Sequence, residues 1–133
     1  MKYSASCHCK KINIEVEAPE RLTVQECNCS ICRKTGHLHL IVPRSHLQIL
    51  SGAESTTLYQ FNTKVARHYF CRHCGVKVFY VPRSNPQGYS VNARCLEPVP
   101  DMTVETFDGR NWEDNAHTLS HLTPDPDATD NKP

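Results

Sequence analysis

The sequence predicts a mostly β domain with antiparallel sheets and short helical turns. Strand-like segments of five or six residues recur along the chain, and turn signals such as "SGAE" and "PRSNPQG" separate them. No window shows sustained helical periodicity, which argues against long amphipathic helices. The length of 133 residues predicts a single domain with a modest core.

The first predicted strand, 12–16 ("INIEV"), alternates apolar and polar residues as a half-buried strand does. Five more segments follow: 37–42 ("HLHLIV"), 56–61 ("TTLYQF"), 65–70 ("VARHYF"), 76–81 ("VKVFYV") and 88–93 ("GYSVNA"). Within 61–64, "FNTK" predicts a tight hairpin. Single helical turns are predicted at "SICRK" and at the start of "PRSHLQIL" (43–50), because proline is tolerated at a first helical position.

The domain is predicted to span residues 1–119, followed by a disordered tail over 120–133. The tail contains "TPDPDATDNKP", which has no apolar residue large enough to pack. The N-terminus lacks the apolar segment of a secretory signal, and no apolar run is long enough to cross a membrane. We therefore expect a cytoplasmic protein with no membrane partner, whose cysteines stay reduced.

The composition argues against a nucleic-acid-binding protein and for a fold that needs extra stabilisation. The net charge is +1, so a nucleic-acid partner is not expected, since binding phosphates needs a surplus of Lys and Arg. Only 38% of residues are hydrophobic, and small domains short of core are usually stabilised by a metal or by disulfides. The oligomeric state, a homo-oligomer included, is left open.

Eight cysteines are the strongest signal, and seven of them form three tight clusters. The clusters are C-x-C at Cys7 and Cys9, C-x-C-x-x-C at Cys27, Cys29 and Cys32, and C-x-x-C at Cys71 and Cys74. The last pair stands before a glycine, which is typical of a zinc knuckle. Cysteines this close in sequence make poor disulfides with one another. In a reducing compartment the clusters therefore indicate zinc.

The clusters divide naturally into two zinc sites. The two pairs supply four thiolates, enough for a closed structural site that joins the N-terminal strand to the central hairpin. The triple Cys27, Cys29 and Cys32 holds an ion from three sides and leaves the fourth position open, as in catalytic zinc sites. Cys95 or a histidine could instead complete the second site. Solvent exposure is the expectation for the histidines: His8, His37, His39, His73, His117 and His121.

An open three-thiolate zinc favours thiol chemistry. Its net charge of about −1 makes it weak at producing hydroxide, whereas it lowers the pKa of a visiting thiol. Such a site could bind a small thiol as the thiolate and present it to an aldehyde. A zinc-stapled protein-interaction module without catalysis, or a redox or metal-buffering protein, would use the same cysteines differently.

The stretches "CHCKK", "ECNCSICRKTG", "YFCRHCGVKVFY" and "YSVNARCLE" resemble the glutathione-dependent formaldehyde-activating enzyme family. The likeness runs from about Ser6 to Leu96 and continues loosely to "FDGRNWE". The eukaryotic branch of this family includes centromere protein V, and "SVNARCL" leans towards that branch. Three cysteine clusters in the family's order make the resemblance specific.

The resemblance implies a zinc-stabilised antiparallel β-tent fold with two zinc ions. It implies structural ligands at Cys7, Cys9, Cys71 and Cys74, and a catalytic site at Cys27, Cys29 and Cys32. The implied activity is that of a carbon–sulfur lyase acting on a small thiol–aldehyde adduct such as S-(hydroxymethyl)glutathione, with glutathione and a small aldehyde as partners. Cations for the glutathione carboxylates would come from among Arg44, Arg67, Arg72, Arg83 and Arg94.

Overall fold

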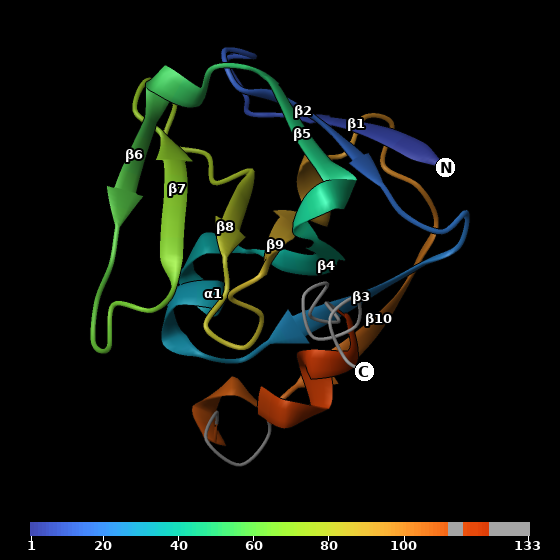
Figure 1. Cartoon of the computed structure of the whole chain (residues 1–133), viewed down its shortest axis with the longest axis vertical. Helices are drawn as coiled ribbons and strands as arrows, with labels where there is room; N and C mark the ends of the chain where they lie inside the picture. The colour runs from blue at the N-terminus through green and yellow to red at the C-terminus, as the bar shows by residue number, and fades with distance from the viewer. Residues whose placement is uncertain (112–115, 123–133) are drawn as a thin grey trace, which may run out of the picture.

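A computed structural model describes residues 1–111 and 116–122, and its fold is mostly β, as predicted (Figure 1). A three-stranded sheet has the order β1-β2-β5 and a seven-stranded sheet the order β10-β3-β4-β9-β8-β7-β6. The strands of the small sheet are β1 (Lys2–Ser6), β2 (Asn13–Glu17) and β5 (Leu47–Ser51). Those of the large sheet are β3 (Leu22–Cys27), β4 (Leu38–Pro43), β6 (Thr56–Tyr59), β7 (Arg67–Cys71), β8 (Phe79–Val81), β9 (Gly88–Asn92) and β10 (Met102–Phe107).

Helical structure is confined to short turns in the described residues. The only α-helix there is α1 (Ser30–Thr35), which ends at Gly36 in the left-handed conformation with φ of 66°. The 3-10 turns are η1 (Arg44–His46), η2 (Ala53–Ser55), η3 (Ala93–Cys95), η4 (Gly109–Asn111) and η5 (Ala116–Leu122). The predicted turns at "SICRK" and "PRSHLQIL" are thus confirmed, and no described helix is long and apolar enough to cross a membrane.

All six predicted strands are present within a few residues, but four strands were missed: β1, β3, β5 and β10. Two of these, β1 and β5, are the outer strands of the small sheet, and β10 is an edge of the large one. An edge strand is held by pairing on one side, so its sequence alternates less clearly. Most pairs are antiparallel as expected, but β10 pairs with β3 in parallel. The hairpin between β6 and β7 is confirmed, with a loop over 60–66.

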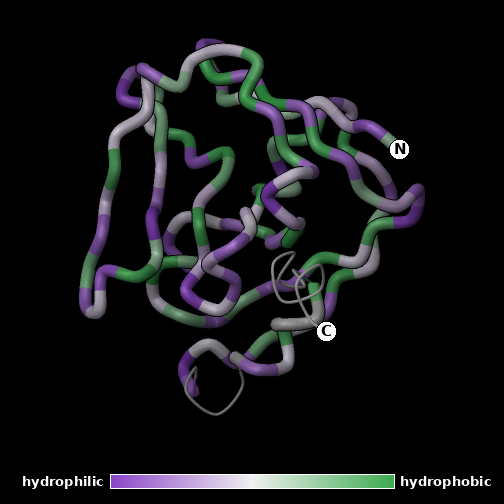
Figure 2. Tube along the Cα trace, viewed as in Figure 1, coloured by the Kyte–Doolittle hydropathy of each residue, from purple (hydrophilic) through white to green (hydrophobic). Residues whose placement is uncertain are grey.

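Strand register gives the large sheet two different faces. Leu38 and Leu40 of β4 point into the main core, which fills the space between the two sheets. Figure 2 shows the resulting alternation of hydrophobic and hydrophilic residues along the chain. His39 of β4 lies on the opposite face and pairs with Gln25 of β3, while Tyr80 of β8 pairs with His68 of β7. The polar residues of four strands therefore gather on one face.

The C-terminal segment covers this polar face at one end. Leu119 of η5 packs with Ile41 and Phe107 in a second, small hydrophobic cluster. Residues 112–115 and 123–133 lie outside the described residues, and with them most of the predicted tail.

Candidate metal centres and cavity

The four-cysteine cluster brings together the N-terminal region and the middle of the chain. Cys7 and Cys9 follow β1, and Cys71 and Cys74 flank the turn after β7. The Sγ atom of Cys9 lies 3.6 Å from the Sγ atoms of both Cys7 and Cys71. All four thiol sulfurs lie within 4.8 Å of one another.

The geometry of this cluster fits a zinc ion. Zn–S bonds of about 2.3 Å in a tetrahedron place sulfurs about 3.8 Å apart, close to the separations seen here. Backbone N–H groups of His73 and Cys74 donate to Cys71 Sγ at 3.4 and 3.5 Å, as expected of a knuckle that stabilises thiolates. Gly75 permits the bend, with φ of 80° and its N–H bonded to Cys71 O at 2.8 Å.

The second cluster forms where β3 ends and α1 begins. Cys27 ends the strand, Cys29 is the N-cap of α1, and Cys32 is buried in its first turn. The three thiols interact with one another, and hydrogen bonds from Cys27 and Cys32 lower the pKa of Cys29. Hydrogen bonds with Cys27 and Cys29, together with burial, raise the pKa of Cys32. Three mutually hydrogen-bonded sulfurs form a donor set that suits a soft cation.

His39 lies directly beside this cluster. Its Nε2 is 3.1 Å from Cys32 Sγ, and one ring nitrogen lies within 4.8 Å of the sulfurs of Cys27 and Cys32. Cys27, Cys32 and His39 together could therefore also hold a metal ion. The expectation that His37 and His39 are solvated was wrong: they are only 2% and 5% exposed. Residues two apart in an extended strand share one face, but nothing in the local sequence indicated that other side chains cover this face.

A buried hydrogen-bonded network continues behind His39. Its Nδ1 lies 2.8 Å from Ser90 Oγ and 3.2 Å from the hydroxyl of Tyr80, and Ser90 Oγ lies 3.0 Å from His37 Nε2. Burial lowers the pKa of His39 to about 3 and raises that of Tyr80 well above its ordinary value. These groups are therefore neutral at neutral pH and orient the cluster through hydrogen bonds.

Cys95 does not belong to the second cluster. It lies in η3, packs against the main core, and has Cys7 and Cys74 among its electrostatic neighbours. Burial raises its pKa to about 11, so the thiol stays protonated. Among the described residues, the donor group at Cys27 and Cys32 includes His39 and not Cys95, which argues against Cys95 as a source of the fourth sulfur.

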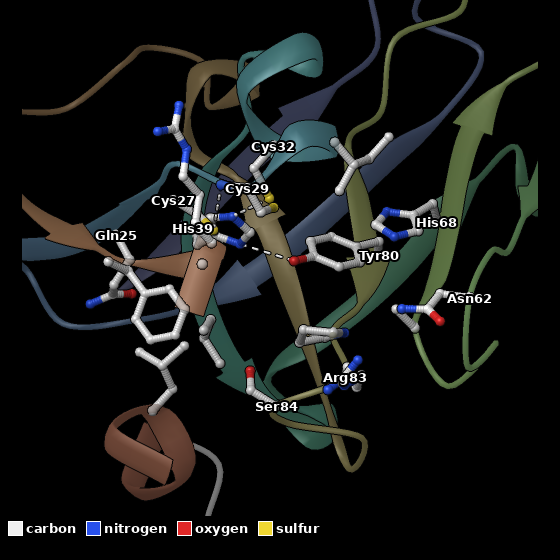
Figure 3. A pocket seen from close by; sticks show the side chains of 18 of the residues that line it. Gln25, Cys27, Cys29, Cys32, His39, Asn62, His68, Tyr80, Arg83 and Ser84 are labelled. Atoms are coloured by element: carbon white, nitrogen blue, oxygen red, sulfur yellow. Dashed lines mark hydrogen bonds between the residues drawn. The ribbon is translucent and has the colours of Figure 1, made fainter. Parts of the chain in front are cut away.

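A cavity of about 480 Å³ opens beside the three-cysteine cluster (Figure 3). One wall is polar, with His39, Tyr80 and His68, and the facing wall includes apolar side chains such as Phe107 and Leu119. The volume is that of a small-molecule site. Of the five arginines considered from sequence, only Arg83 lines this cavity, and Arg110, which was missed, joins it. No Asp or Glu is among its described lining residues.

Gly109 of η4 lies directly against the cluster. A Cβ atom at this position would collide with Cys27 Sγ and stand 3.0 Å from Cys29 Cβ. We therefore expect Gly109→Ala to displace the Cys27 thiol and to weaken metal binding by about 10–100-fold, the range typical of a disturbed metal environment. Competition with a chelator, monitored by cobalt(II) absorption, measures this affinity. Thr103→Ala, on exposed β10, serves as the control; equal affinities in the two variants would contradict the prediction.

The site defines a cysteine-rich β-protein with two donor groups that could hold metal ions, one of which opens to a cavity. The model of the glutathione-dependent formaldehyde-activating enzyme family matches residues 2–111, and the chain belongs to this family. A Halomonas elongata protein whose name assigns it provisionally to these enzymes is 32% identical over 82 residues. That match spans 56% of this chain and 52%, about half, of the relative. A crystal structure of a Rhodobacter sphaeroides protein is 39% identical with a TM-score of 0.69, covering 79% of this chain and 100% of that one.

Proposed function

We propose that this protein is a zinc-dependent carbon–sulfur lyase that interconverts glutathione and formaldehyde with S-(hydroxymethyl)glutathione. The observation that carries the proposal is the cavity beside Cys27, Cys29 and Cys32. The family's name supports the choice of thiol and aldehyde. The same cysteines are proposed as ligands of a catalytic zinc, and Cys7, Cys9, Cys71 and Cys74 as ligands of a structural zinc.

The separation between His39 and Cys32 supports a vacant fourth position. A nitrogen and a sulfur that bind one tetrahedral zinc ion lie about 3.6 Å apart, given bonds of about 2.0–2.1 and 2.3 Å. The observed 3.1 Å is shorter and suits a hydrogen bond between the ring and the sulfur. We assign His39 to orienting Cys32, so that the position facing the cavity remains for a substrate thiol.

An ion bound by the three thiols would stabilise a substrate sulfur as its thiolate. The protein's own residues then hold the partners together, which reduces the entropic cost of their encounter. The cavity's apolar wall, with Phe107 and Leu119, limits water near the reacting sulfur. Arg83 and Arg110 give the cavity a positive charge that suits the carboxylates of glutathione.

Exchange spectroscopy by NMR tests the proposal directly. The zinc-loaded protein is added to glutathione and [13C]formaldehyde, and the rate of exchange between free aldehyde and adduct is measured. Because the uncatalysed reaction is itself fast, the rate must rise in proportion to protein concentration. An unchanged rate would reject the lyase and favour the interaction module without catalysis.

The arginine at the cavity mouth gives a separate prediction. We expect Arg110→Met to raise the KM for glutathione about 10-fold, because a hydrogen bond to a charged group contributes roughly 1.5–3 kcal/mol. The KM for 2-mercaptoethanol, which has no carboxylate, should stay unchanged. Arg67→Met, on the exposed side of β7, is the control. An equal rise for both thiols would show that Arg110 shapes the cavity and does not bind a carboxylate.

A further inference from the structure

Next to Tyr80, the buried His68 lines the same cavity, and the buried Lys77 contacts this histidine. His68 of β7 stacks on the Tyr80 ring, with centroids 4.5 Å apart and planes inclined by 10°. Figure 3 shows His68 on the far side of Tyr80 from His39. The Nζ atom of Lys77 lies 3.1 Å from His68 Nδ1 and 4.3 Å from the centroid of the Tyr80 ring. His68 and Lys77 are 3% and 6% exposed, so this arrangement is fixed by packing.

The contact with Lys77 determines where the proton of His68 sits. An ammonium group only donates hydrogen bonds, so His68 Nδ1 must accept and the ring proton must be on Nε2. Burial, followed by the charge of Lys77, lowers the pKa of His68 to about 4, which keeps the ring neutral. Burial likewise lowers the pKa of Lys77 to about 8, while the neighbouring thiols act in the opposite direction. The amine is therefore mostly cationic at neutral pH.

The remaining nitrogen of His68 has a use that the proposed function does not assign. No residue in the described part of the chain hydrogen-bonds to His68 Nε2, and the side chain lines the cavity together with Cys29 and Tyr80. Because Nδ1 of the neutral His68 ring accepts from Lys77, its Nε2–H is available as a donor to a ligand in the cavity. The matching group on the ligand is an acceptor such as an oxygen atom.

We propose that His68 is a catalytic residue whose Nε2–H donates to the oxygen of the bound aldehyde and of its thiol adduct, with Lys77 as the positioning residue. The inference rests on the proposed function. In the addition, the S–C bond forms as the C=O π bond breaks, and its electron pair moves to oxygen. That oxygen takes up the proton the thiol has lost, so no oxidant or reductant is needed. His68 keeps its own proton and stabilises the developing negative charge.

Variants of His68 test the role of the donor in the zinc-loaded protein. His68→Phe keeps a flat ring on Tyr80 but has no donor, and we expect the catalysed exchange rate to fall by roughly 10²-fold, as for the loss of one oxyanion donor. His68→Gln restores an N–H donor and should recover most of the rate. His46→Phe, at an exposed histidine outside the cavity, is the control. If His68→Phe keeps the wild-type rate, the proposal is overturned.

The tautomer gives a readout independent of activity and of the folding of any His68 variant. Long-range 1H–15N NMR spectra of the wild type should show protonated Nε2 and unprotonated Nδ1 for His68. In Lys77→Met, His68 should be a mixture of both tautomers. The activation barrier of the bound substrate should rise, so we expect a lower kcat with an unchanged KM. A wild-type His68 ring protonated on Nδ1 would overturn the proposal.

The proposed function and the role of His68 can fail separately. A wild-type protein that does not accelerate exchange would reject the proposed function. A wild-type protein that is active, with a His68→Phe variant of equal rate, would reject only the role of His68.

Discussion

Replacing Cys71 by serine is expected to leave the chain unfolded. Cys71 is fully buried, and its sulfur lies 3.6 Å from that of Cys9, which is 62 positions earlier in the sequence. A structural zinc contributes roughly 10–16 kcal/mol to folding in zinc-finger peptides. The whole stability of a domain is about 5–15 kcal/mol, so losing this ion removes an amount comparable to the total. Circular dichroism during heating and metal analysis of the purified variant measure the effect.

The matched control for this change is Cys95→Ser. Cys95 is a half-buried neighbour of the same cluster but is not one of the four thiols whose sulfurs lie within 4.8 Å. Its replacement removes one thiol and should leave the metal content unchanged, with melting within a few degrees of wild type. A Cys71→Ser protein that melts like the Cys95→Ser control would show that the cluster does not stabilise the fold through a metal.

The sequence was most informative where chemistry and periodicity coincide. The spacing of the cysteines predicted the four-cysteine cluster and the closeness of Cys27 and Cys32, because residues this near in a turn must lie together, but it did not indicate that His39 joins the second donor group. The strand predicted at "VKVFYV" requires neighbours such as Phe79 and Tyr80 to lie on opposite faces, and they lie in the core and the cavity respectively. Both inferences depend on neighbours in the chain.

The parts that could not be predicted depend on distant contacts. The burial of His39 follows from side chains that are distant in the sequence, with its Nδ1 hydrogen-bonded to Ser90 and Tyr80. Nothing in the local sequence indicates that Lys77 is buried, yet it is only 6% exposed and its Nζ lies 3.1 Å from His68 Nδ1. Gly109 carries no local signal at all, and only the close approach of η4 to Cys27 reveals its importance.

Replacing Cys29 by serine is expected to abolish thiol handling while the fold survives. Cys29 belongs to neither hydrophobic cluster, and it occupies the N-cap of α1, a position where serine is among the preferred residues. The helix should therefore form normally. The serine hydroxyl has a far higher pKa than the thiol and is a poor zinc ligand, so the second ion loses one of its three sulfurs. We expect the glutathione-dependent exchange rate to fall to the uncatalysed value.

Cobalt(II) substitution separates this effect from a loss of folding. The wild type should take up two cobalt ions, and glutathione should change the sulfur-to-cobalt charge-transfer bands of only one of them. In Cys29→Ser the bands of the four-cysteine site should remain and the response to glutathione should vanish, while melting stays near that of Cys95→Ser. The comparison with Cys71→Ser tests the proposed division of roles, in which the four-cysteine set stabilises the fold and the three-cysteine set binds the substrate. If Cys29→Ser still responds to glutathione, the sulfur of the substrate must bind elsewhere, and the three-cysteine cluster would be a second structural metal site.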